Sequence, residues 1–250
     1  MNKKSIQVTA SILIIGNEIL SGRTQDVNIA TLSKWLNTLG VKTKEVRVIP
    51  DIEDTIIETV NNLRNNFNYV FTTGGIGPTH DDITAESISK AFNVRYEFHK
   101  DAFKILEEYY LPGEFNEGRQ KMAKMPADSN LILNPSSGAP GFFIENVFCL
   151  PGVPLILQSM LGGLKHVIVG GNPTLSDTIN LKTVESEIAK SLTKIQNHNN
   201  EVEIGSYPFF KAGKLGVSIV LRSENQKKIN ECKTEILNLI SKKKIKIIKK

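Results

Sequence analysis

The stretch Tyr69-Val-Phe-Thr-Thr-Gly-Gly-Ile-Gly-Pro-Thr-His-Asp-Asp-Ile-Thr84 joins a short apolar strand pattern to a glycine-rich loop, and a helical pattern follows from Thr84 to Phe92. A strand that leads through such a loop into a helix is typical of α/β proteins. In open α/β sheets, ligands bind outside the carboxyl ends of the strands. We therefore expect this loop to form part of a binding site.

The residues before this stretch show the same alternation of strand and helix. An apolar run predicts a buried strand at Val8 to Ile15, and an alternating pattern predicts a second strand at Val41 to Val48. Apolar residues at helical spacing predict helices at Asp26 to Leu39 and Asp51 to Phe67. This order indicates a parallel, doubly wound sheet with helices on its faces.

Polar residues follow each of the three predicted strands. They are Asn17-Glu18, Asp51, and the glycine loop with Asp81-Asp82. Because the carboxyl ends of parallel strands lie at the same edge of a sheet, we expect these polar groups to lie close together.

The middle of the chain is less regular. A helical pattern from Lys100 to Ala127 is broken by Pro112-Gly113 and predicts a lid or an outlying helix pair. Two further strands are predicted at Asn130 to Leu133 and Gly141 to Leu150, and a helix begins at Leu155.

Gly170-Gly-Asn-Pro173 has the composition of a linker, which places a domain boundary there. Residues 1–172 form the predicted α/β domain, and residues 173–250 form a predicted small α+β domain. The elements expected in the second domain are helix Val184 to Gln196, strands Glu201 to Phe210 and Val217 to Ser223, and helix Gln226 to Lys242.

Composition and charge argue against a nucleic-acid-binding, membrane or secreted protein. The net charge of +5 is modest and comes largely from the tail Lys242 to Lys250, which we expect to be a solvated end, so nucleic-acid binding is not expected. No apolar run approaches the roughly 18 residues of a membrane span, and no signal peptide is found, so we expect a cytoplasmic protein. Cys149 and Cys232 lack ligand spacing and predict neither a disulfide nor a zinc site.

The glycine loop has features of an anion site. Glycines at Gly74, Gly75 and Gly77 allow a ligand to approach the backbone, and amides at the start of a helix favour phosphate. Carboxylates beside a phosphate site suit a hard cation such as Mg²⁺ that bridges them to the phosphate oxygens. One of Asp81 and Asp82 is then expected to cap the helix and the other to bind the metal.

Two other carboxylates have alternative interpretations. Asp51 either supplies a carboxylate to the same site or caps the helix that follows it. Glu18 either contacts the ligand or caps backbone groups. Ser136 and Ser137 either bind a phosphate or shape their turn. No arrangement for covalent catalysis is found.

Four segments together resemble a known family. Besides Thr73-Gly-Gly-Ile-Gly with Asp82-Ile-Thr84, they are Gly16-Asn-Glu-Ile-Leu-Ser-Gly22, Arg119-Gln-Lys-Met-Ala-Lys-Met-Pro126 leading to Asn134-Pro-Ser-Ser-Gly-Ala-Pro-Gly141, and Leu150-Pro-Gly-Val-Pro154. The set resembles the molybdenum-cofactor biosynthesis (MoaB/Mog-type, molybdopterin-binding) family. It is similar in particular to the N-terminal domain of the CinA competence/damage-inducible proteins and to the molybdopterin-binding-type domain of FAD synthase.

The resemblance implies a three-layer α/β/α fold that binds a phosphorylated pterin or a nucleotide, and it implies self-association. Two acidic positions tied to function in that family match Asp51 and Asp82, which are the expected catalytic and metal-binding residues. The resemblance also implies a nucleotide pyrophosphatase that acts on ADP-ribose or FAD with Mg²⁺, Mn²⁺ or Co²⁺. The alternatives are a molybdopterin-binding or adenylyl-transfer protein and a non-catalytic binding module. The ligand-binding residues expected here are Thr73, Gly74, Gly75, Gly77, Asp81, Glu18, Ser137, Gly138, Pro151 and Gly152.

Overall fold

The structure is a computed structural model that describes residues 7–211 and 213–248. The chain divides into two compact units, one up to Gly171 and the other from Asn172. Each unit is described by itself.

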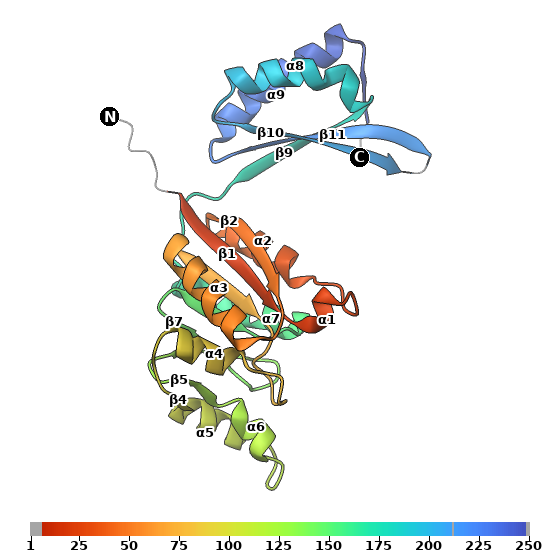
Figure 1. The fold of residues 1–250 in the computed structure, drawn as a ribbon. Helices are drawn as coiled ribbons and strands as arrows, with labels where there is room; N and C mark the ends of the chain where they lie inside the picture. The colour runs from red at the N-terminus through yellow and green to blue at the C-terminus, as the bar shows by residue number, and fades with distance from the viewer. Residues whose placement is uncertain (1–6, 212, 249–250) are drawn as a thin grey trace, which may run out of the picture. The chain divides into compact units, whose positions relative to one another are not determined.

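The first unit is built on one mixed, mostly parallel sheet with the strand order β2-β1-β3-β8-β7-β6 (Figure 1). Strands β2, β1, β3 and β8 are parallel, whereas β7 is antiparallel to β8 and β6 is antiparallel to β7. The strand bounds are β1 Val8–Ile15, β2 Val41–Ile49, β3 Tyr69–Thr73, β6 Asn130–Ile132, β7 Gly141–Ile144 and β8 Val147–Leu150. The predicted doubly wound sheet is confirmed.

Successive side chains of β1 enter two different cores, because strand residues alternate between the faces of a sheet. Leu13 and Ile15 pack with helices α3 (Glu53–Asn66), α4 (Thr84–Ala91) and α5 (Lys100–Tyr109). Ile12 and Ile14 pack with α2 (Asn28–Thr38), α7 (Pro154–Met160) and the 3-10 helix η1 (Leu161–His166). Helices therefore cover both faces, which gives the three-layer α/β/α arrangement (Figure 1).

The two cores explain why β1 reads as a continuous apolar run. A strand that is buried on both faces is apolar at most positions, whereas a half-exposed strand alternates. Ser11 is a buried polar exception in β1. In β1 the residues from Ala10 to Ile15 are all buried.

The outlying helix pair predicted between Lys100 and Ala127 corresponds to α5 and to α6 (Glu117–Lys121). Two short antiparallel strands that the sequence does not predict flank the pair, namely β4 (Tyr96–Phe98) and β5 (Lys124–Pro126). Rings of Phe103, Tyr110 and Phe115 pack this segment from within.

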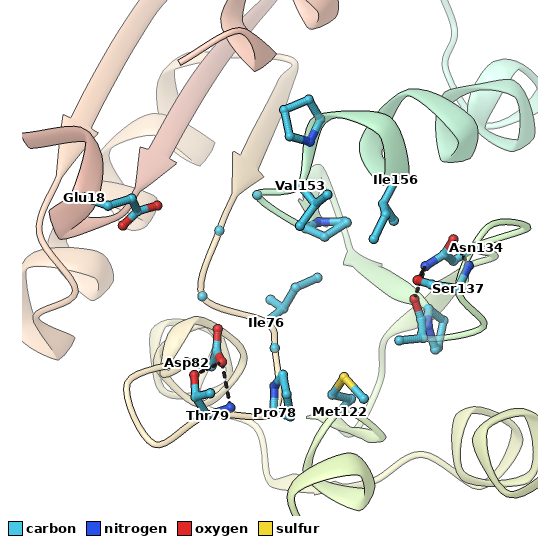
Figure 2. Close-up of a pocket in the computed structure, with 18 of the residues that line it drawn as sticks. Glu18, Ile76, Pro78, Thr79, Asp82, Met122, Asn134, Ser137, Val153 and Ile156 are labelled. Atoms are coloured by element: carbon cyan, nitrogen blue, oxygen red, sulfur yellow. Dashed lines mark hydrogen bonds between the residues drawn. The ribbon is translucent and has the colours of Figure 1, made fainter. Parts of the chain in front are cut away.

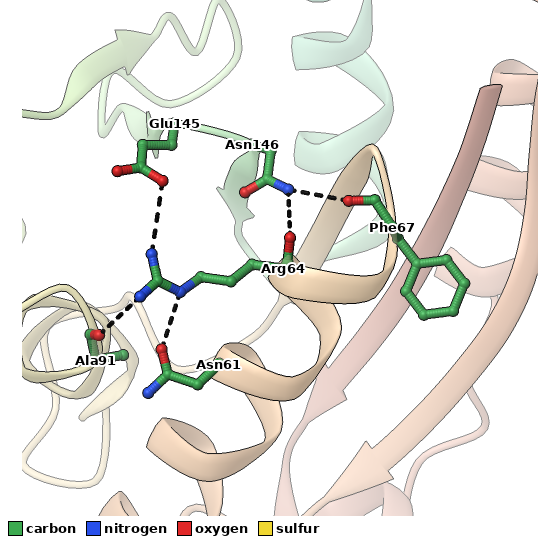
Figure 3. Close-up of polar contacts among 6 residues, drawn as sticks. All are labelled: Asn61, Arg64, Phe67, Ala91, Glu145 and Asn146. Carbon is green, nitrogen blue, oxygen red and sulfur yellow. Dashed lines mark hydrogen bonds and ion pairs between the residues drawn. The ribbon is translucent and has the colours of Figure 1, made fainter.

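Arg64 connects three elements on the α3 side of the first unit (Figure 3). Its guanidinium donates to Asn61 at 2.9 Å and to the Ala91 carbonyl at 3.4 Å, and lies 4.0 Å from the centroid of the Phe92 ring. It also pairs with Glu145 at 3.5 Å. Glu145 has a left-handed backbone, with φ 48°, at the turn where the predicted single strand Gly141 to Leu150 folds into the β7–β8 hairpin. That prediction of one strand is wrong.

The second unit is an antiparallel sheet with the order β10-β11-β9-β12, whose core is closed by helices α8 and α9. The bounds are β9 Leu175–Lys182, α8 Glu185–His198, β10 Glu203–Lys211, β11 Lys214–Ser223, α9 Gln226–Lys242 and β12 Lys246–Ile247. Strand β9 is not predicted from the sequence. The tail predicted to be solvated pairs with β9 through β12, and only Lys249 and Lys250 of it lie outside the described residues.

None of the helices in the described ranges is both long enough and apolar enough to cross a membrane.

Candidate functional site

The strand order places a site where the direction of winding reverses. The chain passes from β1 to β2 on one side and then to β3 on the other side of β1, so the loops after β1 and β3 diverge at a switch point. A cavity of about 560 Å³ opens there, lined by the loop after β3, the loop after β8 and the turn between β6 and β7 (Figure 2). Of the polar groups predicted to share this edge, Glu18, the glycine loop and Asp82 line the cavity, whereas Asn17, Asp51 and Asp81 do not.

The glycine loop after β3 approaches its neighbours so closely that side chains do not fit. Gly74 has φ +102°, and a Cβ there would lie 2.1 Å from the carbonyl oxygen of Ile15. Gly75 has φ +68°, and its Cβ would lie 2.1 Å from Oγ1 of Thr84. The Gly75 carbonyl accepts a hydrogen bond from the Thr84 amide at 2.9 Å, which joins the loop to the start of α4.

This loop leaves backbone donors available in the cavity. Within residues 7–211 and 213–248, the amides of Gly75, Ile76 and Gly77 donate to no protein acceptor, although all three residues line the cavity. Successive free N–H groups in a loop with left-handed residues form a concave anion site.

Asp82 lines the cavity beside these amides. Its Oδ2 accepts hydrogen bonds from the amide and the hydroxyl of Thr79, at 2.8 Å and 2.5 Å. Neither Asp81 nor Asp82 caps α4, because the N-cap residue is Ile83 and no side chain bonds to the first turn. The predicted capping role is wrong, since Asp82 closes its own turn with Thr79 instead.

Asp81 lies outside the cavity lining and is exposed. The Thr79 side chain, its own backbone amide, His80 and Lys121 lower the pKa of Asp81. The Thr79 hydroxyl has a single proton, and the geometry assigns it to Asp82, so we attribute this pKa effect mainly to the amide and the nearby charges.

The loop after β1 brings Glu18 to the cavity but leaves Asp51 outside its lining. Glu18 is an exposed residue of α1 (Asn17–Leu20). Asp51 accepts a hydrogen bond from the Asn17 amide at 2.9 Å. It does not cap α3, whose N-cap is Ile52. Asp51 therefore fixes the loop that carries Glu18.

The turn between β6 and β7 is organised by Asn134. Its Oδ1 accepts from the amides of Ser136 and Ser137, and its Nδ2 donates to Oγ of Ser137 at 2.7 Å and to the carbonyl of Ala139. The Ser137 hydroxyl accepts this bond, so its own proton is available to a ligand in the cavity. Gly138, in contrast, lies against the Tyr109 ring and does not line the cavity.

The loop after β8 forms the third wall, with Pro151 and Gly152 in the lining. The buried Asn28 donates from Nδ2 to the Gly152 carbonyl at 2.8 Å. Thr73 lines a smaller adjoining cavity of about 60 Å³, which also contacts Glu18 and Gly152.

Of the two residues expected to bind the metal, Asp82 lines the cavity and Asp51 does not. In the described part of the chain, no cluster of three or more His, Cys, Asp or Glu residues could hold a metal ion by itself. Among the described lining residues, Asp82 and Glu18 carry the carboxyl groups. Two carboxylates suit Mg²⁺ when a bound phosphate completes its coordination.

Several lining residues were missed from the sequence. They are Thr24, Ile76, Pro78, Thr79, Met122, Asn134, Ala139, Pro140, Val153, Pro154 and Ile156. Thr79 and Asn134 lie inside the quoted motifs and could have been found as turn-forming residues. Met122 also lies inside a quoted segment, Arg119 to Pro126, but its place in the cavity depends on how the segment that carries α6 packs.

Comparison with known proteins identifies the family and the fold. Residues 11–170 match the family described as "Probable molybdopterin binding domain", and residues 173–248 match "FAD synthase, middle domain". A protein of Archaeoglobus fulgidus is 33% identical over 91% of this chain and 97% of its own length. A "Putative competence-damage inducible protein" of Clostridium botulinum is 30% identical over 88% of this chain, which spans only 56% of that protein.

Among solved structures, the protein CinA of Thermoplasma acidophilum is 31% identical and has a TM-score of 0.61, covering 64% of this chain and 96% of its own. The predicted family resemblance and fold class are both confirmed. The chain belongs to the family of molybdopterin-binding domains that includes CinA-like proteins, and its C-terminal region matches the middle domain of FAD synthase.

Proposed function

We propose that the cavity binds a dinucleotide through its pyrophosphate and that the protein hydrolyses this pyrophosphate with a divalent cation. The observation that carries the proposal is the set of free amides at Gly75, Ile76 and Gly77 directly beside the Asp82 carboxylate. Free amides favour phosphate oxygens, whereas a carboxylate repels them unless a cation lies between the two.

The rest of the cavity suits a flat, largely apolar group. Ile76, Met122, Val153 and Ile156 lie between the acidic side and the turn of Asn134 and Ser137 (Figure 2). A volume of about 560 Å³ falls in the range of small-molecule sites. A nucleobase or pterin ring would pack on these side chains, and the Ser137 hydroxyl would donate to one of its polar atoms.

In the proposed reaction, the chain's own groups bind and orient the substrate. The loop amides hold the phosphate oxygens, and Asp82 with Glu18 would hold the cation. Charge neutralisation on the phosphate oxygens and activation of the attacking water are the chemistry that a divalent cation supplies when it is bound. Water adds to one phosphorus, the bond from that phosphorus to the bridging oxygen breaks, and two monophosphates leave with one proton released to solvent.

A second candidate is a protein that binds molybdopterin. The family description favours this candidate, and a pterin phosphate presents the same two features of a ring and an anion. The two functions differ in turnover, since a pterin-binding protein would bind its ligand without cleaving dinucleotides.

The test is release of monophosphates from ADP-ribose, FAD and NAD, measured by chromatography with Mg²⁺, Mn²⁺ or Co²⁺ and with EDTA. We expect metal-dependent cleavage that is lost in Asp82→Ala and kept in Asp81→Ala, because Asp81 lies outside the lining. Absence of cleavage with every metal would sink the pyrophosphatase proposal for these substrates and favour pterin binding.

A further inference from the structure

Helix α6 contacts the end of the glycine loop. Lys121, the last residue of α6, donates from Nζ to the carbonyl oxygen of Thr79. One turn earlier, Gly118 faces the loop, and a Cβ there would lie 3.4 Å from the Pro78 carbonyl oxygen, an ordinary contact distance. Lys121 therefore bonds to Thr79, and Gly118 faces the preceding residue, Pro78.

Thr79 connects this helix to Asp82. Its amide and hydroxyl both donate to Oδ2 of Asp82, and its carbonyl accepts from the Asp82 amide at 3.3 Å as well as from Lys121. Every polar group of Thr79 is therefore engaged with Asp82 or Lys121. The arrangement occupies Oδ2 of Asp82 and leaves Oδ1 without a hydrogen-bond donor from the described residues.

Lys121 itself does not line the main cavity. It lies with Lys124 and Tyr96 on a small adjoining cavity, of which Asp82 forms a shared wall. Lys124 faces the rings of Phe98 and Tyr96, at 4.8 Å and 5.9 Å, and makes no hydrogen bond to the loop. The two lysines therefore bring the same charge to the same cavity, but only Lys121 bonds to Thr79.

We propose that Lys121 and Thr79 are positioning residues that aim Oδ1 of Asp82 at the cation and the substrate phosphate. This inference rests on the proposed metal-dependent hydrolysis. Without Lys121, the Thr79 carbonyl loses its charged donor, and the turn that orients Asp82 is held only by the hydrogen bonds between Thr79 and Asp82 themselves. The expected consequence is a weaker cation site in a protein that still binds the dinucleotide.

The experiment compares Lys121→Met, Lys121→Arg, Thr79→Val and Thr79→Ser with Lys124→Met as the matched control. The rate of ADP-ribose cleavage is followed as a function of Mn²⁺ and of substrate. We expect Lys121→Met and Thr79→Val to raise the half-saturating Mn²⁺ concentration about tenfold and to lower kcat, with KM for ADP-ribose within about twofold of wild type. Lys121→Arg and Thr79→Ser retain a donor, so both are expected to have a half-saturating Mn²⁺ concentration and a kcat close to those of wild type. Lys124→Met is expected to stay within about twofold of wild type in both quantities.

A half-saturating Mn²⁺ concentration that is the same in Lys121→Met and Lys124→Met overturns the positioning role. An increase in this concentration in Lys121→Met that is equally large in Lys121→Arg also overturns it.

If wild-type protein cleaves nothing, Mn²⁺ binding in the presence of ADP, measured by electron paramagnetic resonance, replaces the cleavage rate as the readout. Mn²⁺ bound equally by wild type and Lys121→Met then overturns this inference, whereas weaker binding in Lys121→Met supports it while the hydrolysis proposal fails. Wild type that also binds no Mn²⁺ overturns both.

Discussion

The backbone amide of Asn17 donates a hydrogen bond of 2.9 Å to Oδ2 of Asp51, and this bond joins the loop after β1 to the residue that follows β2. A positioning role for Asp51 predicts that Asp51→Asn keeps turnover within about threefold of wild type, because the amide oxygen can still accept the bond. Asp51→Ala is expected to lower the free energy of unfolding by about 0.5–1.5 kcal/mol, because the lost hydrogen bond is exposed and water can satisfy the Asn17 amide.

Metal titrations of the cleavage rate separate this role from metal ligation. An Asp51→Asn protein that needs far more Mn²⁺ than wild type would show that Asp51 binds the cation, as the family resemblance implied. Urea unfolding of Asp51→Asn and Asp51→Ala measures the predicted change in the free energy of unfolding.

Gly77 makes room for the Asp82 carboxylate. A Cβ at this position would lie 2.7 Å from Oδ2 of Asp82. Gly77→Ala is therefore expected to displace the carboxylate and to lower cleavage at least about tenfold, while the melting temperature changes little because the loop is near the surface. The control is Gly163→Ala, where a Cβ would meet nothing within 4 Å. Equal activity of the two variants would contradict the assigned contact.

Gly75 and Gly22 have similar left-handed backbones but different surroundings. Their φ angles are +68° and +72°, yet a Cβ at Gly75 would lie 2.1 Å from Oγ1 of Thr84 and a Cβ at Gly22 would meet nothing within 4 Å. Gly22→Ala is expected to cost only the left-handed strain, about 1–2 kcal/mol. Gly75→Ala adds a clash with a buried side chain, so its unfolding free energy should fall further. Chemical denaturation of both proteins measures the difference, and equal losses would show that the contact with Thr84 relaxes freely.

Strands β1, β3 and β8 could be predicted because they lie inside the sheet and most of their residues are buried. Strand β2 lies at the sheet edge with only Val41 and Ile49 buried, and it was predicted from its alternating pattern instead. Strand β9 was not predicted because only two of its residues, Ile179 and Leu181, are buried. Asp177, on the same face of the strand, pairs with Lys233 of α9. That pairing depends on the tertiary fold. The β7–β8 hairpin was missed because its turn uses Glu145 in a left-handed conformation, where glycine or asparagine is the usual signal.

The part of the site that could be predicted from the sequence is the part formed by loops that directly follow predicted strands. The glycine loop, Glu18, Ser137 and Pro151-Gly152 meet at one cavity. The contacts of Met122 and Lys121 depend on where the α6 segment packs, and no local pattern determines that. Asp51 was assigned by resemblance, and its bond to Asn17 can be known only from the folded loop.

Cys149 is expected to make stability depend on pH in the alkaline range. Burial raises the pKa of this thiol from 9.0 to about 12. Since the pKa is raised in the folded state, the contribution to stability is complete below pH 9 and is lost as pH rises from 9 toward 12. The loss amounts to about 1.4 kcal/mol per pH unit. Urea unfolding between pH 8 and pH 10.5 should show a steeper decline for wild type than for Cys149→Ala, and identical slopes would mean that the thiol ionises in the folded protein.

Arg64 and Glu145 allow the stability of the fold to be separated from the chemistry of the site. The Arg64 side chain is 23% exposed, whereas that of Glu145 is 68% exposed. Arg64→Met removes the donor to Asn61 and to the Ala91 carbonyl together with the contact on Phe92 (Figure 3), and should lower the free energy of unfolding by about 1.5–3 kcal/mol. Glu145→Gln removes only a surface ion pair and should lower the free energy of unfolding by less than about 1 kcal/mol.

Neither Arg64 nor Glu145 lines the cavity, so both variants should cleave substrate at the wild-type rate well below their melting temperatures. A cleavage rate that falls in Arg64→Met while the free energy of unfolding is unchanged would contradict this separation. It would mean that the contacts of Arg64 influence the site through α4, whose first residue, Thr84, lies next to Gly75.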